Sequence, residues 1–308
     1  MKSWISPLLL AVFFLLLLMF PAEAVSAASD GLALWYCQVL PSLFPGMILS
    51  SLLIRTNLLT ALLLRLPFVP QHSIPALLPF LGSLCCGYPT GAKLCRDLYD
   101  AEMLEPERAR RLNCCVHCPG PVFVSSFVCG ICFPQTPKLP VFLSIYLPAV
   151  MLWLILCRPD KLADANRLNN SAGFKPPAVG CSLELFDESY SRSLRVMLKI
   201  AGYLMLSSIL LRFCAQLPEP ARTICAIGSG LLEMTGGIRT VSGLFLPLVF
   251  QETLAVCFLC FGGISCLLQI RDAAGHELTA LRTVFCFRLL HGGLSSLCFL
   301  LLRIFLFR

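Results

Sequence analysis

Charged residues are scarce in this sequence, and their scarcity indicates the class of protein. Lysine, arginine, aspartate and glutamate make up 13% of the 308 residues, whereas hydrophobic residues make up 57%. The core of a soluble domain cannot bury so much apolar surface, so the sequence predicts a polytopic protein embedded in the lipid bilayer. We expect an all-α fold built from two related halves.

Several catalytic motifs are also missing. The chain has no His-Glu-x-x-His and no Gly-x-Ser-x-Gly motif, which argues against a hydrolase. The segment from Gly87 to Lys93 superficially resembles a phosphate-binding loop, but Lys-Ser/Thr does not directly follow its second glycine. We therefore expect no enzymatic activity and no cofactor. The 24 basic residues outnumber the 17 acidic ones but lie between apolar runs, which indicates membrane topology and no nucleic-acid partner.

Cysteine is abundant, with 18 residues, yet its placement does not indicate a disulfide scaffold. Most of these cysteines lie inside apolar runs, where a thiol behaves as a small buried hydrophobe. Cys114, Cys115, His117 and Cys118 are ligand types for zinc or iron. Four ligands on about one helical turn cannot easily close a tetrahedron, so we expect no metal site.

The N-terminal half, 1–157, begins with a stretch that resembles a secretory signal, which we expect to remain as an uncleaved first span at 8–20. An amphipathic interfacial helix at 24–40 is expected to end at the proline-rich segment 41–46. Two short apolar runs at 47–54 and 58–68 follow. Then come a hairpin around 81–97, a short solvated helix that begins at Pro106, and spans at 112–133 and 139–157.

The polar stretch 158–193 divides the chain, and its basic residues predict a cytoplasmic loop by the positive-inside rule. The C-terminal half, 194–308, has the same outline as the first half. It contains a span at 194–217, a hairpin around 223–237, and spans at 253–270 and 283–307.

The hairpin at 81–97 is interrupted by Gly-Tyr-Pro-Thr-Gly at 87–91. Glycine permits unusual backbone geometry and proline removes a helix donor, so this segment should uncoil and free several peptide groups. Freed peptide groups cannot face lipid. The segment is therefore either a re-entrant tip inside the protein or a loop at the membrane surface.

The second half is interrupted at corresponding places, by glycines at 228–230 and 233–237 and by Phe-Gly-Gly-Ile-Ser at 261–265. Paired halves with interrupted segments at matching positions are typical of transporters built from internal repeats, whose binding site lies at the repeat interface. We expect the hairpin tips near Pro89 and Thr235 to approach each other at mid-depth.

Six motifs, in order along nearly the whole chain, resemble one family. They are Leu-Pro-Ser-Leu-Phe-Pro at 40–45, Gly-Tyr-Pro-Thr-Gly-Ala-Lys at 87–93, Gly-Pro at 120–121, Gly-Leu-Leu-Glu-Met-Thr-Gly-Gly at 230–237, Phe-Gly-Gly-Ile-Ser at 261–265 with Gln269, and Arg-Leu-Leu-His-Gly at 288–292. The sequence resembles the YlbJ-type sporulation integral membrane proteins, also called SpoVV, of the nucleoside-recognition (Gate) group.

The resemblance implies a core similar to concentrative nucleoside transporters and a role in spore formation. Such proteins are held to move dipicolinic acid across the outer forespore membrane. Where the family typically shows Asn-Asn-Ser-Gly-Pro, this chain has His117-Cys118-Pro119-Gly120-Pro121, so two amides that could bind a ligand are absent.

A carrier of a flat dicarboxylate needs cationic or N–H donors near mid-depth, and the helix starts at the glycine breaks can supply them. The candidate substrate-binding residues are Gly87, Tyr88, Pro89, Gly91, Lys93, Gly120, Glu233, Thr235, Gly262, Gly263, Ser265 and Gln269. We expect Lys93 and Glu233 to border one cavity, because a buried acid is normally paired or functional.

Each candidate also has a structural interpretation. Lys93 can extend to the lipid headgroups, Glu233 can reach water at a hairpin tip, and the glycines at 262–263 can serve helix packing. Arg288 and His291 share a helix face and could contact an anion, but we expect them to mark the interfacial end of the last span.

We predict a transporter of a small anionic carboxylate in the forespore membrane. The first alternative is a structural or assembly factor of the spore envelope, acting with other sporulation membrane proteins. The second is a Gate-type module for metal or nucleoside permeation. A buried tip at 87–91 facing Gly262 favours transport, and an exposed tip favours the structural role.

Overall fold

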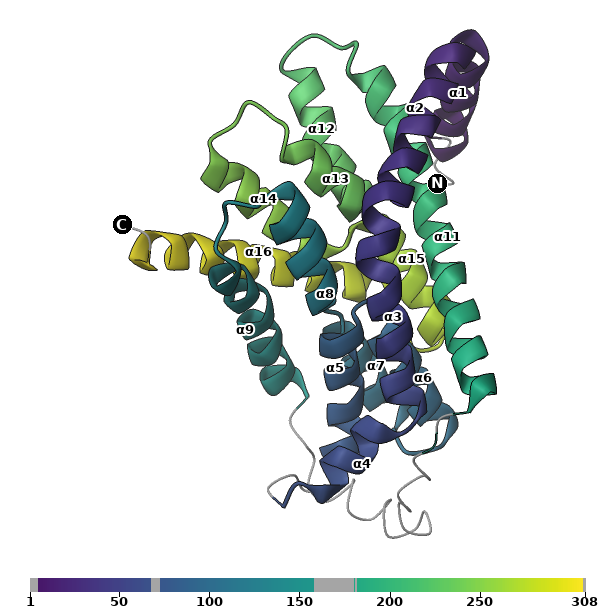
Figure 1. The fold of residues 1–308 in the computed structure, drawn as a ribbon, viewed down its shortest axis with the longest axis vertical. Coiled ribbons are helices and arrows are strands. Elements are labelled where there is room, and N and C mark those ends of the chain that lie inside the picture. Colours follow the sequence, from purple (N-terminus) through teal and green to yellow (C-terminus); the bar gives the residue numbers. More distant parts are fainter. Residues whose placement is uncertain (1–4, 68–72, 158–179, 181, 307–308) are drawn as a thin grey trace.

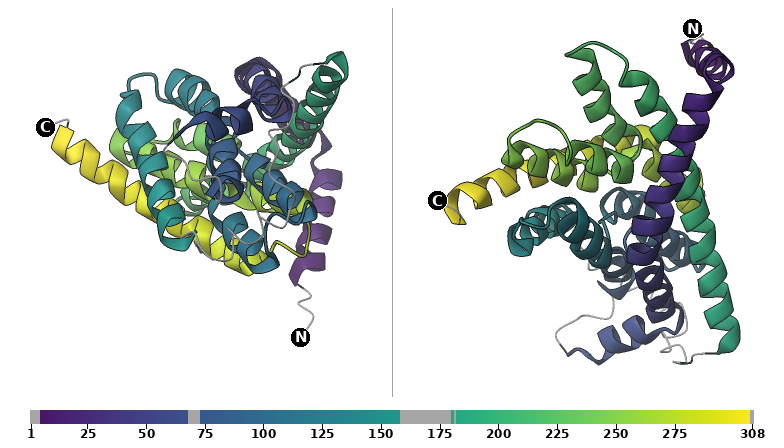
Figure 2. Two further views of the ribbon diagram at one scale, coloured as in Figure 1. Left: turned by 90° about the horizontal axis from the view of Figure 1, so that it is seen from below. Right: turned by 45° about the horizontal axis from the view of Figure 1, so that its top comes forward.

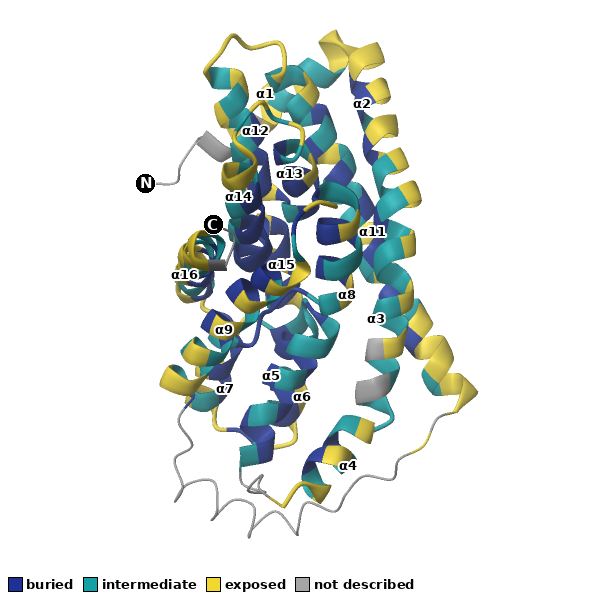
Figure 3. Ribbon diagram, turned by 60° about the vertical axis from the view of Figure 1, so that its left-hand side comes forward, coloured by how far each residue is buried: buried dark blue, intermediate teal, exposed yellow. Residues whose placement is uncertain are grey.

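The computed structural model describes residues 5–67, 73–157, 180 and 182–306, and within these residues every regular element is a helix. The predicted all-α class is confirmed. Five helical stretches are long and apolar enough to cross a membrane: Pro21–Leu49, Lys138–Leu156, Leu183–Cys214, Leu248–Ala274 and Leu281–Phe305. Figure 3 shows exposed residues along the outer helices, and many of them are large apolar side chains that suit a lipid environment.

The N-terminal helices form a longer helical stretch than predicted. After α1 (Ile5–Met19), the helices α2 (Pro21–Leu34), η1 (Trp35–Val39) and α3 (Leu40–Arg55) follow one another directly. The expected end of the helix at 41–46 is wrong, and so is a separate interfacial helix at 24–40. A π-helical turn precedes the prolines, and the Ser42 hydroxyl donates to the Val39 carbonyl over 3.0 Å. Such local adjustments allow proline inside membrane helices.

The remainder of the first half contains the first hairpin and a broken helix. Its elements are α4 (Leu58–Arg65), α5 (Ile74–Cys86), α6 (Thr90–Asp100), α7 (Pro106–Cys115), α8 (Pro121–Phe123), η3 (Val124–Cys132) and α9 (Lys138–Leu156). Pro106 begins α7 as predicted, but the helix is not a solvated connector, because Ala109, Leu112 and Asn113 are buried on its inner face. The predicted span at 112–133 is a broken helix, since the backbone leaves the helix at 116–120.

The second half has the same order of elements. They are α11 (Leu183–Cys214), α12 (Ala221–Leu232), α13 (Met234–Val241), α14 (Leu248–Phe261), α15 (Gly263–Ala274) and α16 (Leu281–Leu306). α11 starts eleven residues before the predicted span, where the Ser182 hydroxyl accepts the N–H of Leu185 as an N-cap. Most of the predicted cytoplasmic loop, 158–179 and 181, lies outside the described residues, so its side of the membrane stays a prediction.

Each half thus contains a hairpin, a broken helix and a long final helix. The hairpins are α5–α6 and α12–α13, the broken helices are α7–η3 and α14–α15, and the final helices are α9 and α16. In Figures 1 and 2, the two hairpins occupy opposite ends of the molecule, with α11 lying along α2 and α3 at one side. Contacts also correspond between the halves, since α6 packs on α15, α13 packs on η3, and α9 packs on α16.

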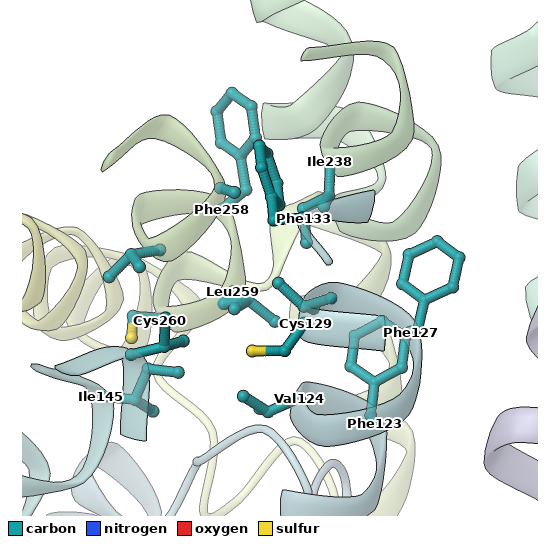
Figure 4. Packing of buried hydrophobic residues seen from close by; sticks show 14 of the residues in the cluster. Phe123, Val124, Phe127, Cys129, Phe133, Ile145, Ile238, Phe258, Leu259 and Cys260 are labelled. Carbon is teal, nitrogen blue, oxygen red and sulfur yellow. The ribbon is translucent and has the colours of Figure 1, made fainter. Parts of the chain in front are cut away.

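The apolar core joins the two halves. Figure 4 shows Phe127 and Cys129 of η3 beside Ile238 of α13 and Leu259 of α14. Phe123 and Phe127 stack with ring centroids 5.1 Å apart. A second buried cluster connects α5, α6 and α7 with α15 and α16. Because both clusters contain residues of both halves, the halves are packed as one unit.

The two arms of the second hairpin touch through glycine. A Cβ added at Gly237 of α13 would lie 2.1 Å from the Cα of Gly230 on α12, whereas one added at Gly228 meets nothing within 4 Å. We predict that Gly237→Ala destabilises the protein by about 1–3 kcal/mol through overpacking. Gly228→Ala, the control in the same hairpin, should be neutral or stabilise by up to about 1 kcal/mol through helix propensity. Thermal unfolding of the purified variants in detergent measures both, and an equal loss in both would contradict the close contact.

Candidate functional site

The tip of the first hairpin packs against the break in the first broken helix. A Cβ on Gly87, whose φ is +75°, would lie 2.7 Å from the Gly120 nitrogen, and one on Gly91 would lie 2.1 Å from the Val116 carbonyl oxygen. The Cys118 N–H donates to the Ser83 hydroxyl on α5 over 2.8 Å. Gly87 and Gly91 are buried, so the tip lies inside the protein and is not a surface loop.

The tip of the second hairpin packs in the same way against the second break. A Cβ on Gly263, whose φ is +75°, would lie 2.9 Å from the Leu232 carbonyl oxygen at the end of α12. Gly263 therefore serves close packing, which is the structural role that the sequence left open for it. Each hairpin tip thus contacts the break of the helix that follows it in the chain.

Glu233 at the second tip is only 5% exposed, so it does not extend into bulk water. Its carboxylate accepts the N–H groups of Thr235 over 2.9 Å and of Gly236 over 2.6 Å, at the start of α13. The helix N-terminus carries a partial positive charge, which stabilises a carboxylate there. The partner of this buried acid is therefore the N-terminus of its own helix.

Arg288 of α16 joins the first tip to both breaks. Its Nε donates to the Phe261 carbonyl over 2.9 Å, and its two terminal nitrogens donate to the His117 carbonyl and to the Tyr88 hydroxyl. The guanidinium also lies over the Tyr88 ring, 4.6 Å from the ring centroid. The Tyr88 hydroxyl in turn donates to the Leu259 carbonyl over 2.9 Å.

The prediction that Arg288 and His291 mark the interfacial end of the last span is wrong. Their exposed fractions are 2% and 4%, and His291 contacts the Ile145 carbonyl over 3.0 Å. A central arginine costs about 2.5–3.5 kcal/mol on insertion scales. Three hydrogen bonds from a charged donor, each worth about 1.5–3 kcal/mol, offset that cost here.

Both tips and both broken helices line one inner cavity of about 60 Å³. Seven of the twelve predicted site residues lie on its wall: Gly87, Tyr88, Gly120, Glu233, Thr235, Ser265 and Gln269. Residues of both tips therefore face one interior cavity, and the approach of the segments near Pro89 and Thr235 at mid-depth of the membrane stays a prediction. A cavity of this size has room for one or two water molecules.

A larger pocket of about 440 Å³, here called the vestibule, lies between α3, α6, α11 and α15. It shares Tyr88 and Gln269 with the inner cavity, so the two spaces adjoin. Pro89 and Lys93 line the vestibule. The expected single cavity bordered by Lys93 and Glu233 is thus two adjoining ones, with Lys93 in the outer space and Glu233 in the inner.

The vestibule is basic. Five basic residues and two acidic ones line it: Arg55, Lys93, Arg192, Arg195 and Lys199, with Asp97 and Asp272. Lys93 pairs with Asp97, and Lys199 pairs with Asp272 over 2.8 Å. Partial burial and the neighbouring charge of Arg192 lower the pKa of Arg55. Arg55 pairs with Glu188, so the surplus positive charge that makes this space attractive to anions comes from Arg192 and Arg195.

Three predicted site residues line neither space. Gly91 and Gly263 make the backbone contacts described above. Gly262 has a φ of +83°, and a Cβ added there would lie 3.1 Å from a terminal nitrogen of Arg288. Residues that the site prediction omitted include Arg288 and the basic face of α11. Arg192, Arg195 and Lys199 recur at helical spacing, a signal that was hidden because Arg192 was placed in the loop.

The chain is 25% identical over 342 residues to the sporulation integral membrane protein YlbJ of Bacillus subtilis strain 168, an alignment that covers 97% of this chain and 83% of the relative. This similarity over nearly the whole length confirms the resemblance to YlbJ-type proteins that the six motifs predicted. No protein-family model matches the chain, and no solved structure matches it either.

Removal of the Tyr88 hydroxyl should weaken the junction between the first hairpin tip and the second broken helix. Tyr88→Phe leaves a buried donor of Arg288 without its acceptor and the Leu259 carbonyl without its donor, and we predict a loss of about 1–3 kcal/mol. Tyr99→Phe, on the same hairpin but outside both cavities, is the matched control. Thermal unfolding of the two variants should separate them, and equal midpoints would show that the Tyr88 hydroxyl does not hold the tip.

Proposed function

We propose that this relative of the YlbJ-type sporulation integral membrane proteins is a transporter that moves a small carboxylate, dipicolinic acid, across the outer forespore membrane. The observation that carries the proposal is the convergence of two hairpin tips and two helix breaks on one internal cavity that adjoins a basic vestibule. Binding sites near mid-depth, formed by discontinuous helices at a repeat interface, are characteristic of secondary transporters.

The burial of the first tip favours transport over a purely structural role. Unwound backbone inside a membrane protein is costly unless it is paired, and here the tip at 87–91 is enclosed by the break at 116–120 and by α14. A structural envelope factor needs no such interior. The arrangement supports a protein whose interior backbone contacts a ligand.

The charge of the vestibule supports an anionic cargo. Arg192 and Arg195 form no ion pair with any residue that the structure describes, so both are available to a carboxylate. Arginine binds carboxylates in bidentate geometry, which suits an aromatic dicarboxylate. The same basic lining is unfavourable for metal cations, which makes metal permeation the weaker alternative.

A difference between the two hairpins indicates where a cargo carboxylate binds. α13 begins with its own carboxylate, Glu233, on its first N–H groups, whereas α6 begins at Thr90 with no side-chain cap. The vestibule reaches Pro89, Thr90 and Lys93 at this uncapped start. A carboxylate of the cargo can therefore take the place at α6 that Glu233 takes at α13, with the Lys93 ammonium beside it.

The two volumes support an order in which the cargo passes the two spaces. Small-molecule sites usually enclose about 300–1,000 Å³, a range that includes the vestibule but not the inner cavity. The cargo is expected to enter the vestibule first and to pass the tips only after they separate. The bond between the Tyr88 hydroxyl and the Leu259 carbonyl is one contact that must then break.

We predict that Lys93→Ala and Arg195→Gln each lower dipicolinate uptake into liposomes containing the purified protein. Loss of one charged hydrogen bond, about 1.5–3 kcal/mol, corresponds to a weakening of at least about tenfold in apparent affinity. The matched control is Arg212→Gln, because Arg212 lies on the same helix as Arg195 but pairs with Asp30 outside the vestibule. Its uptake should equal that of the wild type.

The outcomes distinguish the alternatives. Folded wild-type protein that transports no carboxylate, together with normal dipicolinate in spores of a deletion strain, would favour the structural role. Uptake of a nucleoside or a metal ion without uptake of a carboxylate would favour the Gate-type module. Normal uptake by both vestibule variants would place the anion site elsewhere.

A further inference from the structure

Arg288 is a buried cation without a carboxylate partner. It forms no ion pair with any residue in the described part of the chain. Its acceptors are the carbonyls of His117 and Phe261 and the hydroxyl of Tyr88. A guanidinium remains charged at any ordinary pH, so its charge must be balanced by dipoles.

The two carbonyls lie at the breaks of the two broken helices. Phe261 is the last residue of α14, and His117 follows the last residue of α7, Cys115, by two positions. The C-terminal end of a helix carries about half a negative charge through its unpaired carbonyls. The C-terminal end of α14 and an unwound carbonyl just beyond α7, one from each half of the chain, therefore face a single positive group.

This arrangement is the one that binds inorganic cations in other carriers. In transporters with discontinuous helices, unwound carbonyls and half-helix C-termini coordinate the coupling Na⁺ or H⁺. Here the corresponding carbonyls point at a side chain of the protein itself. Gly262 permits the approach, because a Cβ at that position would lie 3.1 Å from a terminal nitrogen of Arg288.

We propose that Arg288 is a resident cation that occupies the junction of the two broken helices in place of an inorganic ion. Its charge, together with its hydrogen bonds, holds the breaks at 116–120 and 262 and the tip at Tyr88 in one arrangement. The protein accordingly has no requirement for Na⁺ at this junction. The proposal does not depend on the identity of the cargo, and its test uses no transport assay.

The test separates the effect of the charge at residue 288 on stability from the effect of its hydrogen-bond donors. Arg288→Lys keeps the charge, Arg288→Gln keeps N–H donors without a charge, and Arg288→Ala removes both. Purified full-length variants in detergent, prepared in choline chloride, are unfolded thermally and followed by tryptophan fluorescence. We expect the midpoints to fall in the order wild type, Lys, Gln, Ala. A Gln variant as stable as the Lys variant, or more stable, would overturn the proposal.

A diffusible cation provides the second measurement. Methylguanidinium should raise the midpoint of thermal unfolding of Arg288→Ala relative to an equal concentration of choline. At a methylguanidinium concentration of about ten times its Kd, the ratio of folded to unfolded protein rises about 11-fold. The wild type and Arg282→Ala, an exposed arginine on the same helix, should not respond. No selective response of Arg288→Ala would overturn the proposal, and so would selective stabilisation of the wild type by Na⁺. If Arg288→Ala cannot be purified in choline, the yield of folded protein purified in methylguanidinium replaces the midpoint of thermal unfolding as the measurement. No folded protein in methylguanidinium would likewise count against the proposal.

Discussion

Unwound backbone inside the membrane is the constraint on which this structure depends. Peptide groups freed at the hairpin tips and the helix breaks have no water to bind in hydrocarbon, so the protein must pair or enclose them. It does so twice with the same arrangement, in which the tip of each hairpin lies against the break of the next broken helix. Arg288 then connects the first tip to both breaks, so the two arrangements are held in one interior.

The functional proposal follows from the two spaces beside that interior, the inner cavity and the vestibule. The apolar clusters shared by the halves fix the broken helices, and the inner cavity lies where both tips meet. The vestibule beside it has a surplus of positive charge and reaches a helix start that lacks its own acidic cap. A polar interior with an anion-attracting entrance is costly to maintain in a membrane protein, and the proposed passage of an anionic solute would account for both features.

The sequence predicted the parts of this fold that glycine and proline mark locally. The hairpins around 81–97 and 223–237 and the interruption at Gly262 were found because clustered glycine and proline residues release the helical backbone locally, whereas single prolines such as Pro45 and Pro148 remain inside helices. The break at 116–120 falls at Pro119 and Gly120, which are residues of the same two types. The start of α11 was missed because its first residues are polar, although they continue the helix.

The role of Arg288 could not be predicted, because it depends on long-range pairing. The His117 carbonyl that it binds is 171 residues away in the chain, and nothing near Arg288 in sequence identifies that partner. An isolated arginine among apolar residues near a span terminus more simply indicates an interfacial anchor. Only the packing of α16 against α7 and α14 gives it buried acceptors.

The most direct test of the account is the structure of the purified chain in a lipid nanodisc with saturating dipicolinate, determined by electron cryomicroscopy. The account predicts ligand density in the vestibule, with a carboxylate at the start of α6 beside Lys93 and the arginines of α11 around it. Ligand density only on the outer surface, or none under conditions in which the chain is folded as described here, would contradict it.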